Sequence, residues 1–167
     1  DDIPLTDHGK EQARSAVRVL KELLARSELA KVTLICSPYL RAVMTANEVL
    51  DELRAGCQDA DDVLNLGTIT VDLEFMESMY GIFFKEDPLP KLEAYKLTPE
   101  DIAAKYLHPG SEIVLPQPDE WTAASAHFPE AVGDDFERLY KGFGGAISKY
   151  GRSDRAGSNV VVLVGHG

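Results

Sequence analysis

An apolar strand that ends in a histidine is the feature of this sequence that most constrains the fold: Asn159-Val160-Val161-Val162-Leu163-Val164-Gly165-His166-Gly167. An unbroken run of valine and leucine favours a β-strand. Ligands of open α/β sheets bind at the carboxyl ends of the strands, and flanking glycines allow a ligand to approach the backbone closely. His166 is therefore a candidate site residue; the competing interpretation is a histidine in an ordinary turn.

A second apolar strand leads directly into a helix. Residues 32–36 are rich in β-branched side chains, which favours a buried strand. Ser37 and Pro38 follow, and these residue types suit a helix N-cap and the first helical position. Arg41 falls in the first turn of that helix, where free backbone N–H groups and the helix dipole favour anions. A guanidinium there can grip two phosphate oxygens, although a surface arginine would have the same pattern.

The rest of the chain alternates helices and strands. A first helix is expected after Thr6, a further strand at residues 68–71, and a third long helix at residues 134–150 before the terminal strand. This alternation indicates a layered α/β fold. At 167 residues, the whole chain is expected to form one domain. The third helix places a set of apolar residues on one face: Phe136, Leu139, Tyr140, Phe143 and Ile147.

Residues from about 78 to 128 interrupt the alternation. They are rich in proline, and this predicts an irregular insertion within the domain. A short helix is expected to begin at Thr98, where a capping threonine, a proline and two acidic residues occur in succession. Long irregular segments inside compact domains are usually functional or disordered.

Glu77 is a candidate general acid because it lies a few residues beyond the strand expected at 68–71. Its neighbours Phe75 and Met76 are apolar, so its carboxyl group is expected to be partly desolvated, as general-acid chemistry favours. A solvated loop acid is the competing interpretation, and Glu74 competes for the same role.

The other candidates are weaker. His8, His108 and His127 have the context of surface histidines. No cysteine and histidine cluster has zinc spacing, and neither of the common glycine-rich nucleotide-binding motifs occurs in the sequence. The expectation is therefore a protein without a metal or cofactor.

Composition narrows the possible partners. The net charge of -11 argues against nucleic acid, since binding to a phosphate backbone needs a basic face. No apolar run approaches the ~18 residues that a spanning helix needs. The two cysteines, Cys36 and Cys57, form no framework; one disulfide is possible, but a reduced, cytoplasmic chain is expected. The oligomeric state stays open.

Four segments, taken in order, resemble the histidine phosphatase (phosphoglycerate mutase-like) superfamily. They are L-T-x-x-G-x-x-Q-A at residues 5–13, S-P-x-x-R-A at residues 37–42, the lone Glu77, and the histidine and glycine at the end of the terminal strand. The resemblance implies a three-layer α/β/α sandwich around a mainly parallel sheet. It also implies a pocket in which two histidines and two arginines surround a phosphate.

The resemblance assigns roles to three residues of this chain. Arg41 corresponds to a phosphate-binding arginine, His166 to the second histidine, which contacts the phosphate and takes part in catalysis, and Glu77 to the proton donor. Residues 71–77 and 97–103 are similar to the branch that contains T-cell-receptor-signalling suppressors and ecdysteroid phosphatases. Ser78 stands where that branch often has tryptophan, and this departure bears on the substrate.

The superfamily opens with an R-H-G motif that carries the phosphate-accepting histidine, and no such motif occurs in this sequence. The chain is therefore expected to be incomplete at both ends. The leading hypothesis is a phosphomonoester hydrolase that forms a phosphohistidine and acts on a phosphorylated small molecule or phosphoprotein. Two alternatives stay open: a phosphoglycerate mutase, and a catalytically inactive phosphatase-like domain that binds partners.

Overall fold

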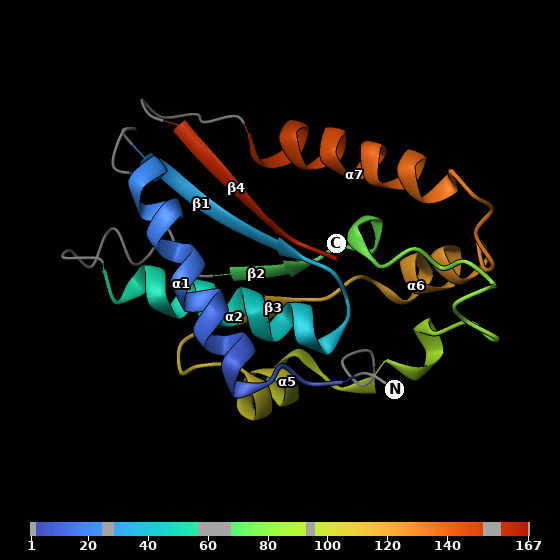
Figure 1. The fold of residues 1–167 in the computed structure, drawn as a ribbon, viewed down its shortest axis with the longest axis horizontal. Coiled ribbons are helices and arrows are strands. Elements are labelled where there is room, and N and C mark those ends of the chain that lie inside the picture. Colours follow the sequence, from blue (N-terminus) through green and yellow to red (C-terminus); the bar gives the residue numbers. More distant parts are fainter. Residues whose placement is uncertain (1–2, 25–28, 57–67, 93–95, 152–157, 167) are drawn as a thin grey trace.

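The fold was analysed in a computed structural model that describes residues 3–24, 29–56, 68–92, 96–151 and 158–166. Four parallel strands form one sheet in the order β3-β2-β1-β4 (Figure 1). Their bounds are β1 Leu29–Cys36, β2 Thr68–Val71, β3 Glu112–Val114 and β4 Ser158–Val164. The strands expected from the apolar runs are thus present, and the sheet is parallel as predicted.

Helices cover both faces of this sheet. The α-helices are α1 Asp7–Leu24, α2 Leu40–Arg54, α5 Pro99–Tyr106, α6 Pro118–Ser125 and α7 Asp134–Tyr150, with short 3-10 helices η1 Leu73–Phe75 and η2 Leu89–Lys91. Figure 1 shows α1 and α2 on one side of the strands and α7 on the other. Leu34 and Val162 pack with α1 and α2 in the largest core cluster, whereas Ile35 and Val161 pack with α7. Because successive strand residues face opposite sides, these contacts define three layers and confirm the predicted α/β/α architecture.

The first two helices begin in different ways. Thr6 caps α1 as predicted, since its hydroxyl accepts a hydrogen bond from the Gly9 amide at 3.1 Å. Ser37 does not cap α2: the helix begins at Leu40, after an extended Tyr39 with no side-chain cap. The Ser37 hydroxyl has a different partner, described below, so the predicted N-cap is wrong although the predicted helix is correct.

The segment 78–128 contains more regular structure than its sequence pattern indicates. The helix expected after Thr98 is α5, which opens with a capping box between Thr98 and Asp101. The sequence analysis missed β3 and α6. Each of these two elements has one buried residue, Ile113 in β3 and Trp121 in α6. A single buried residue does not produce a recognisable periodic pattern of apolar residues in the sequence. The expected irregular insertion is therefore partly ordered, and β3 extends the sheet.

Helix α7 packs closely through two small residues, while part of its expected apolar face lies exposed. Phe136, Tyr140 and Ile147 are exposed, whereas Gly142 and Ala146 are buried. A Cβ atom at Gly142 would lie only 2.7 Å from the Cβ of Glu74. The absence of a side chain at Gly142 thus lets α7 approach η1 closely.

This packing predicts opposite effects for three glycine substitutions in one helix. Gly142→Ala is expected to destabilise the protein by ~1–3 kcal/mol, because overpacking outweighs the gain in helix propensity. Gly144→Ala and Gly145→Ala add a Cβ with nothing within 4 Å and are expected to stabilise it by up to about 1 kcal/mol. Urea unfolding measures all three, and equal effects would contradict the close packing of α7.

None of the described helices is both long enough and apolar enough to cross a membrane.

Candidate functional site

Three strands end at the same level, and this brings distant segments together. Cys36 at the end of β1 lies opposite Val71 of β2 and opposite Val164 of β4. Beyond the strands, the Ser37 amide donates to the Val164 carbonyl at 2.9 Å. The residues that follow β1 and β4 therefore meet at the carboxyl edge of the sheet, which is where α/β folds bind ligands.

Arg41, Glu77 and His166 meet at this edge and are called the Arg41–Glu77–His166 cluster below. The Nη2 atom of Arg41 lies 2.7 Å from Oε2 of Glu77 and 3.1 Å from Nδ1 of His166. The side chains of Arg41 and Glu77 are 34% and 40% exposed, and that of His166 is 15% exposed. The three residues that the sequence singled out are thus in contact, with solvent access from one side.

The hydrogen bonds around His166 determine its tautomer. Arginine only donates hydrogen bonds, so the Nδ1 atom that faces Arg41 must accept. The proton of the neutral ring then lies on Nε2, which donates to the hydroxyl oxygen of Ser37 at 2.8 Å. Ser37 is fully buried. Its hydroxyl therefore holds the ring with the Nδ1 lone pair directed toward Arg41.

Tyr39 packs against two members of the cluster. The guanidinium carbon of Arg41 lies 4.6 Å from the centre of the Tyr39 ring, in a cation–π contact. The His166 ring meets the same tyrosine edge-on, with centroids 5.1 Å apart. Sequence analysis gave Tyr39 no role, because an aromatic residue within S-P-x-x-R-A carries no chemical signal by itself.

Burial lowers the pKa of His166 below its ordinary value of 6.5, and the nearby positive charge of Arg41 lowers it further. The carboxylate of Glu77 opposes this shift. His166 is consequently neutral at pH 7 in the ligand-free protein. A bound anion next to the ring would favour the imidazolium form instead.

Glu77, rather than Glu74, is the carboxylate in the cluster. Glu74 lies within η1, and its side chain pairs with Lys141 of α7 at 2.7 Å. Glu77 follows η1 and reaches Arg41. The neighbouring side chains of Phe75 and Met76 are buried in two other clusters and leave Glu77 partly exposed, so its desolvation is only partial.

The other histidines lie elsewhere. His8 is exposed on α1 next to Glu11, and Nε2 of His108 lies 3.3 Å from Oε1 of Glu48. His127 lines a cavity of about 770 Å³ beside α6 and α7. This cavity is the larger of the two described but contains no member of the Arg41–Glu77–His166 cluster, so we place the candidate site at the cluster.

Cys36, the residue before Ser37, does not offer a reactive thiol to the site. The thiol is completely buried, and burial raises its pKa far above its ordinary value, with the negative charge of Asp72 adding to the shift. Cys57, the other cysteine considered for a disulfide, lies outside the described residues. Within the described ranges, no group of three or more histidine, cysteine or acidic side chains is arranged to hold a metal ion.

Comparison with known families gives a match over the first part of the chain. Residues 1–71 match the model of the histidine phosphatase superfamily (branch 1), which is consistent with the superfamily predicted from the sequence motifs. The match includes Arg41 and ends before Glu77 and His166. No curated protein matches the sequence. This partial match supports phosphatase or mutase-type activity in general terms.

The shifted pKa of His166 predicts a pH dependence of stability. Because the folded state holds this pKa below 6.5, the unfolded chain binds more protons in the pH range between the two values. The contribution of His166 is therefore fully present above about pH 6.5 and is lost as the pH falls through the folded-state value. NMR titration of His166 and urea unfolding at several pH values measure this, and His166→Gln should flatten the slope. A folded-state pKa at or above the peptide value would contradict the assignment.

Proposed function

We propose that this protein is a phosphomonoester hydrolase in which the substrate phosphoryl group binds at the Arg41–Glu77–His166 cluster. The observation that carries the proposal is the meeting of an arginine, a histidine and a glutamate from three separate segments at the carboxyl edge of a parallel sheet. Anion binding, transition-state stabilisation and proton donation each need one of these groups.

Substrate binding would replace the Glu77 carboxylate by the substrate phosphate as the partner of Arg41. In the ligand-free protein, the Glu77 carboxylate accepts from Nη2 of Arg41. A phosphate dianion would take over this donor, since guanidinium binds phosphate oxygens in bidentate fashion. The displaced carboxylate would then lie beside the phosphate, where repulsion between the two anions favours uptake of a proton by Glu77. That proton can be delivered to the departing ester oxygen.

The covalent step follows the chemistry that the superfamily resemblance implies. An imidazole nitrogen attacks phosphorus while the ester P–O bond breaks, and Glu77 protonates the leaving oxygen. Water then attacks the phosphohistidine and releases inorganic phosphate. Among the described histidines, His8, His108 and His127 lie outside the cluster. The proposal therefore assigns the accepting role to the histidine of an R-H-G motif outside these 167 residues, and His166 stabilises the transferred group.

A second cavity offers a place for the leaving group. It has a volume of about 200 Å³ and is lined by apolar and charged side chains, among them Tyr39, Phe83, Phe84 and Leu92. Tyr39 is also the residue that contacts both Arg41 and His166. A cavity of roughly 150 Å³ is large enough for benzene. This supports an aromatic phosphate ester as the assay substrate.

The test is hydrolysis of p-nitrophenyl phosphate by the natural-length protein in the presence of EDTA. Arg41→Ala and His166→Ala are each expected to lower kcat/KM by ~10²–10³, the loss typical when a transition-state donor is removed. Arg18→Ala removes an exposed arginine of α1 and should leave activity unchanged. Vanadate should inhibit the wild type.

Other outcomes decide against this proposal. EDTA-sensitive activity, or activity that survives His166→Ala, would exclude the assigned roles. Phosphate transfer between phosphoglycerates would identify a mutase. Phosphate binding that is lost in Arg41→Ala, without any turnover, would identify the binding-only alternative.

A further inference from the structure

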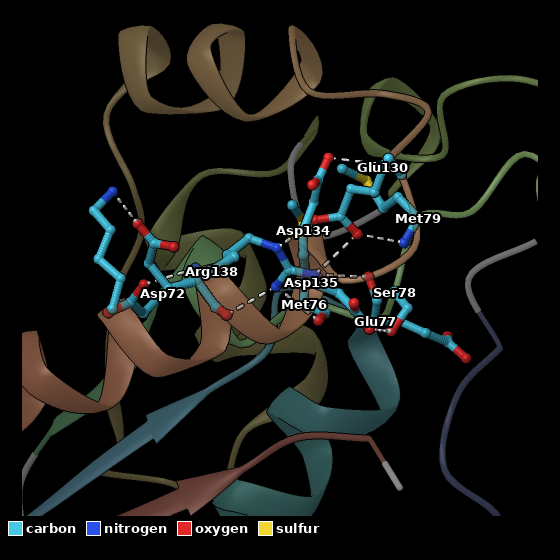
Figure 2. Close-up of polar contacts among 12 residues, drawn as sticks. Asp72, Met76, Glu77, Ser78, Met79, Glu130, Asp134, Asp135 and Arg138 are labelled. Atoms are coloured by element: carbon cyan, nitrogen blue, oxygen red, sulfur yellow. Dashed lines mark hydrogen bonds and ion pairs between the residues drawn. The ribbon is translucent and has the colours of Figure 1, made fainter.

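Arg138 of α7 is a nearly buried arginine that the proposed chemistry does not use. Its side chain is 11% exposed and pairs with Glu130, which is 2% exposed. Nε donates to Oε1 of Glu130 at 2.6 Å, and Nη2 donates to Oε2 at 3.1 Å. Figure 2 shows this side-on pair between α7 and the loop that carries Glu77. The two residues are called the Arg138–Glu130 pair.

The remaining donors of Arg138 hold the main chain that leads to Glu77. Nη1 donates to the carbonyl oxygens of Glu74 and Met76 at 2.8 and 3.1 Å, and Nη2 donates to that of Glu77 at 3.4 Å. Together with the two bonds to Glu130, all five guanidinium donors have partners. Arg138 therefore has no donor left for a substrate phosphate.

The opposite side of Glu77 is held as well. Oε2 of Glu130 accepts from the Met79 amide at 2.7 Å, and the Glu130 amide donates to the Met79 carbonyl at 3.0 Å. The Ser78 hydroxyl donates to Oδ2 of Asp135 at 2.6 Å (Figure 2). The backbone on both sides of Glu77 is thus fixed from α7 and the segment before it, while the Glu77 side chain reaches Arg41.

We propose that the Arg138–Glu130 pair positions Glu77 for proton donation. A buried ion pair is a poor source of stability compared with apolar residues of similar volume, so a geometric role accounts for the pair better than a stabilising one. The planar guanidinium can bind one carboxylate and three carbonyl groups at once, which a lysine cannot reproduce. Without this pair, the fold could persist while the carboxyl group of Glu77 loses its fixed distance from Arg41. The inference rests on the function proposed above.

The experiment compares two esters that differ in leaving group. Phenyl phosphate needs protonation of its leaving oxygen more than p-nitrophenyl phosphate does, because phenolate is the more basic leaving group. Arg138→Lys is expected to lower kcat for phenyl phosphate by about tenfold or more, a part of the ~10²–10⁴ that general acids contribute. KM and the rate with p-nitrophenyl phosphate should change much less.

A double-mutant cycle separates positioning from simple loss of structure. In a Glu77→Gln background, Arg138→Lys should cause no further loss with phenyl phosphate, because its effect acts through Glu77. Lys141→Met is the matched control: it removes the other α7 ion pair, to the Glu74 side chain, without touching these carbonyl groups. Equal losses with both esters, or an undiminished loss in the Glu77→Gln background, would overturn the inference.

NMR spectroscopy tests the positioning role of Arg138 even if the proposed function fails. Failure of that function would appear as no turnover of either ester by the wild type. In that case the His166 ring signals, which report the contact with Arg41 and Glu77, are compared by NMR in the folded variants. Arg138→Lys should shift them in the direction that Glu77→Gln does, and Lys141→Met should not. Unchanged His166 signals in Arg138→Lys would overturn the positioning role.

Discussion

The register of β1 against its two neighbours is the constraint on which the candidate site depends. Cys36 lies opposite Val71 on one side and opposite Val164 on the other, so three strands end at one level. A slip of one residue in β4 would turn its core face toward the opposite layer and would also withdraw His166 from Arg41. The alternation that packs Val162 against the core cluster of α1 and α2 therefore also sets the position of the histidine.

The charge balance of the site follows from this placement. Arg41 lies between an anionic carboxylate and a neutral imidazole, so the ligand-free cluster carries no net charge. In a chain with a net charge of -11, the cation proposed to bind phosphate is thus already paired with a carboxylate. Under the proposed function, a phosphate dianion competes with Glu77 for Arg41 because it carries more negative charge than one carboxylate. Ser37 also constrains His166, because its buried hydroxyl fixes which ring nitrogen faces a bound anion.

Sequence reasoning located the parts of the site that follow regular elements. Arg41 and His166 could be predicted because each lies just beyond an apolar strand, and strand ends of a parallel sheet converge. Glu77 was chosen over Glu74 through the resemblance alone, since residue type and position do not separate two acidic residues of one short segment. Ser37 was assigned to a helix cap because its residue type suits that role, whereas its actual partner is 129 residues away. The sandwich was predictable; the short elements β3 and α6, with one buried residue each, were not.

Arg138 and Glu130 were beyond sequence reasoning for a different reason. Most of what Arg138 binds is main chain: the carbonyl groups it holds are 61 to 64 residues away, and carbonyl groups have no signature in a sequence. Sites on loops are less precise than sites on helices and strands, and Glu77 lies on a loop. Holding that loop by its backbone transfers the rigidity of α7 to it. Part of the geometry proposed for the site is therefore encoded in a helix that contributes no residue to the cluster itself.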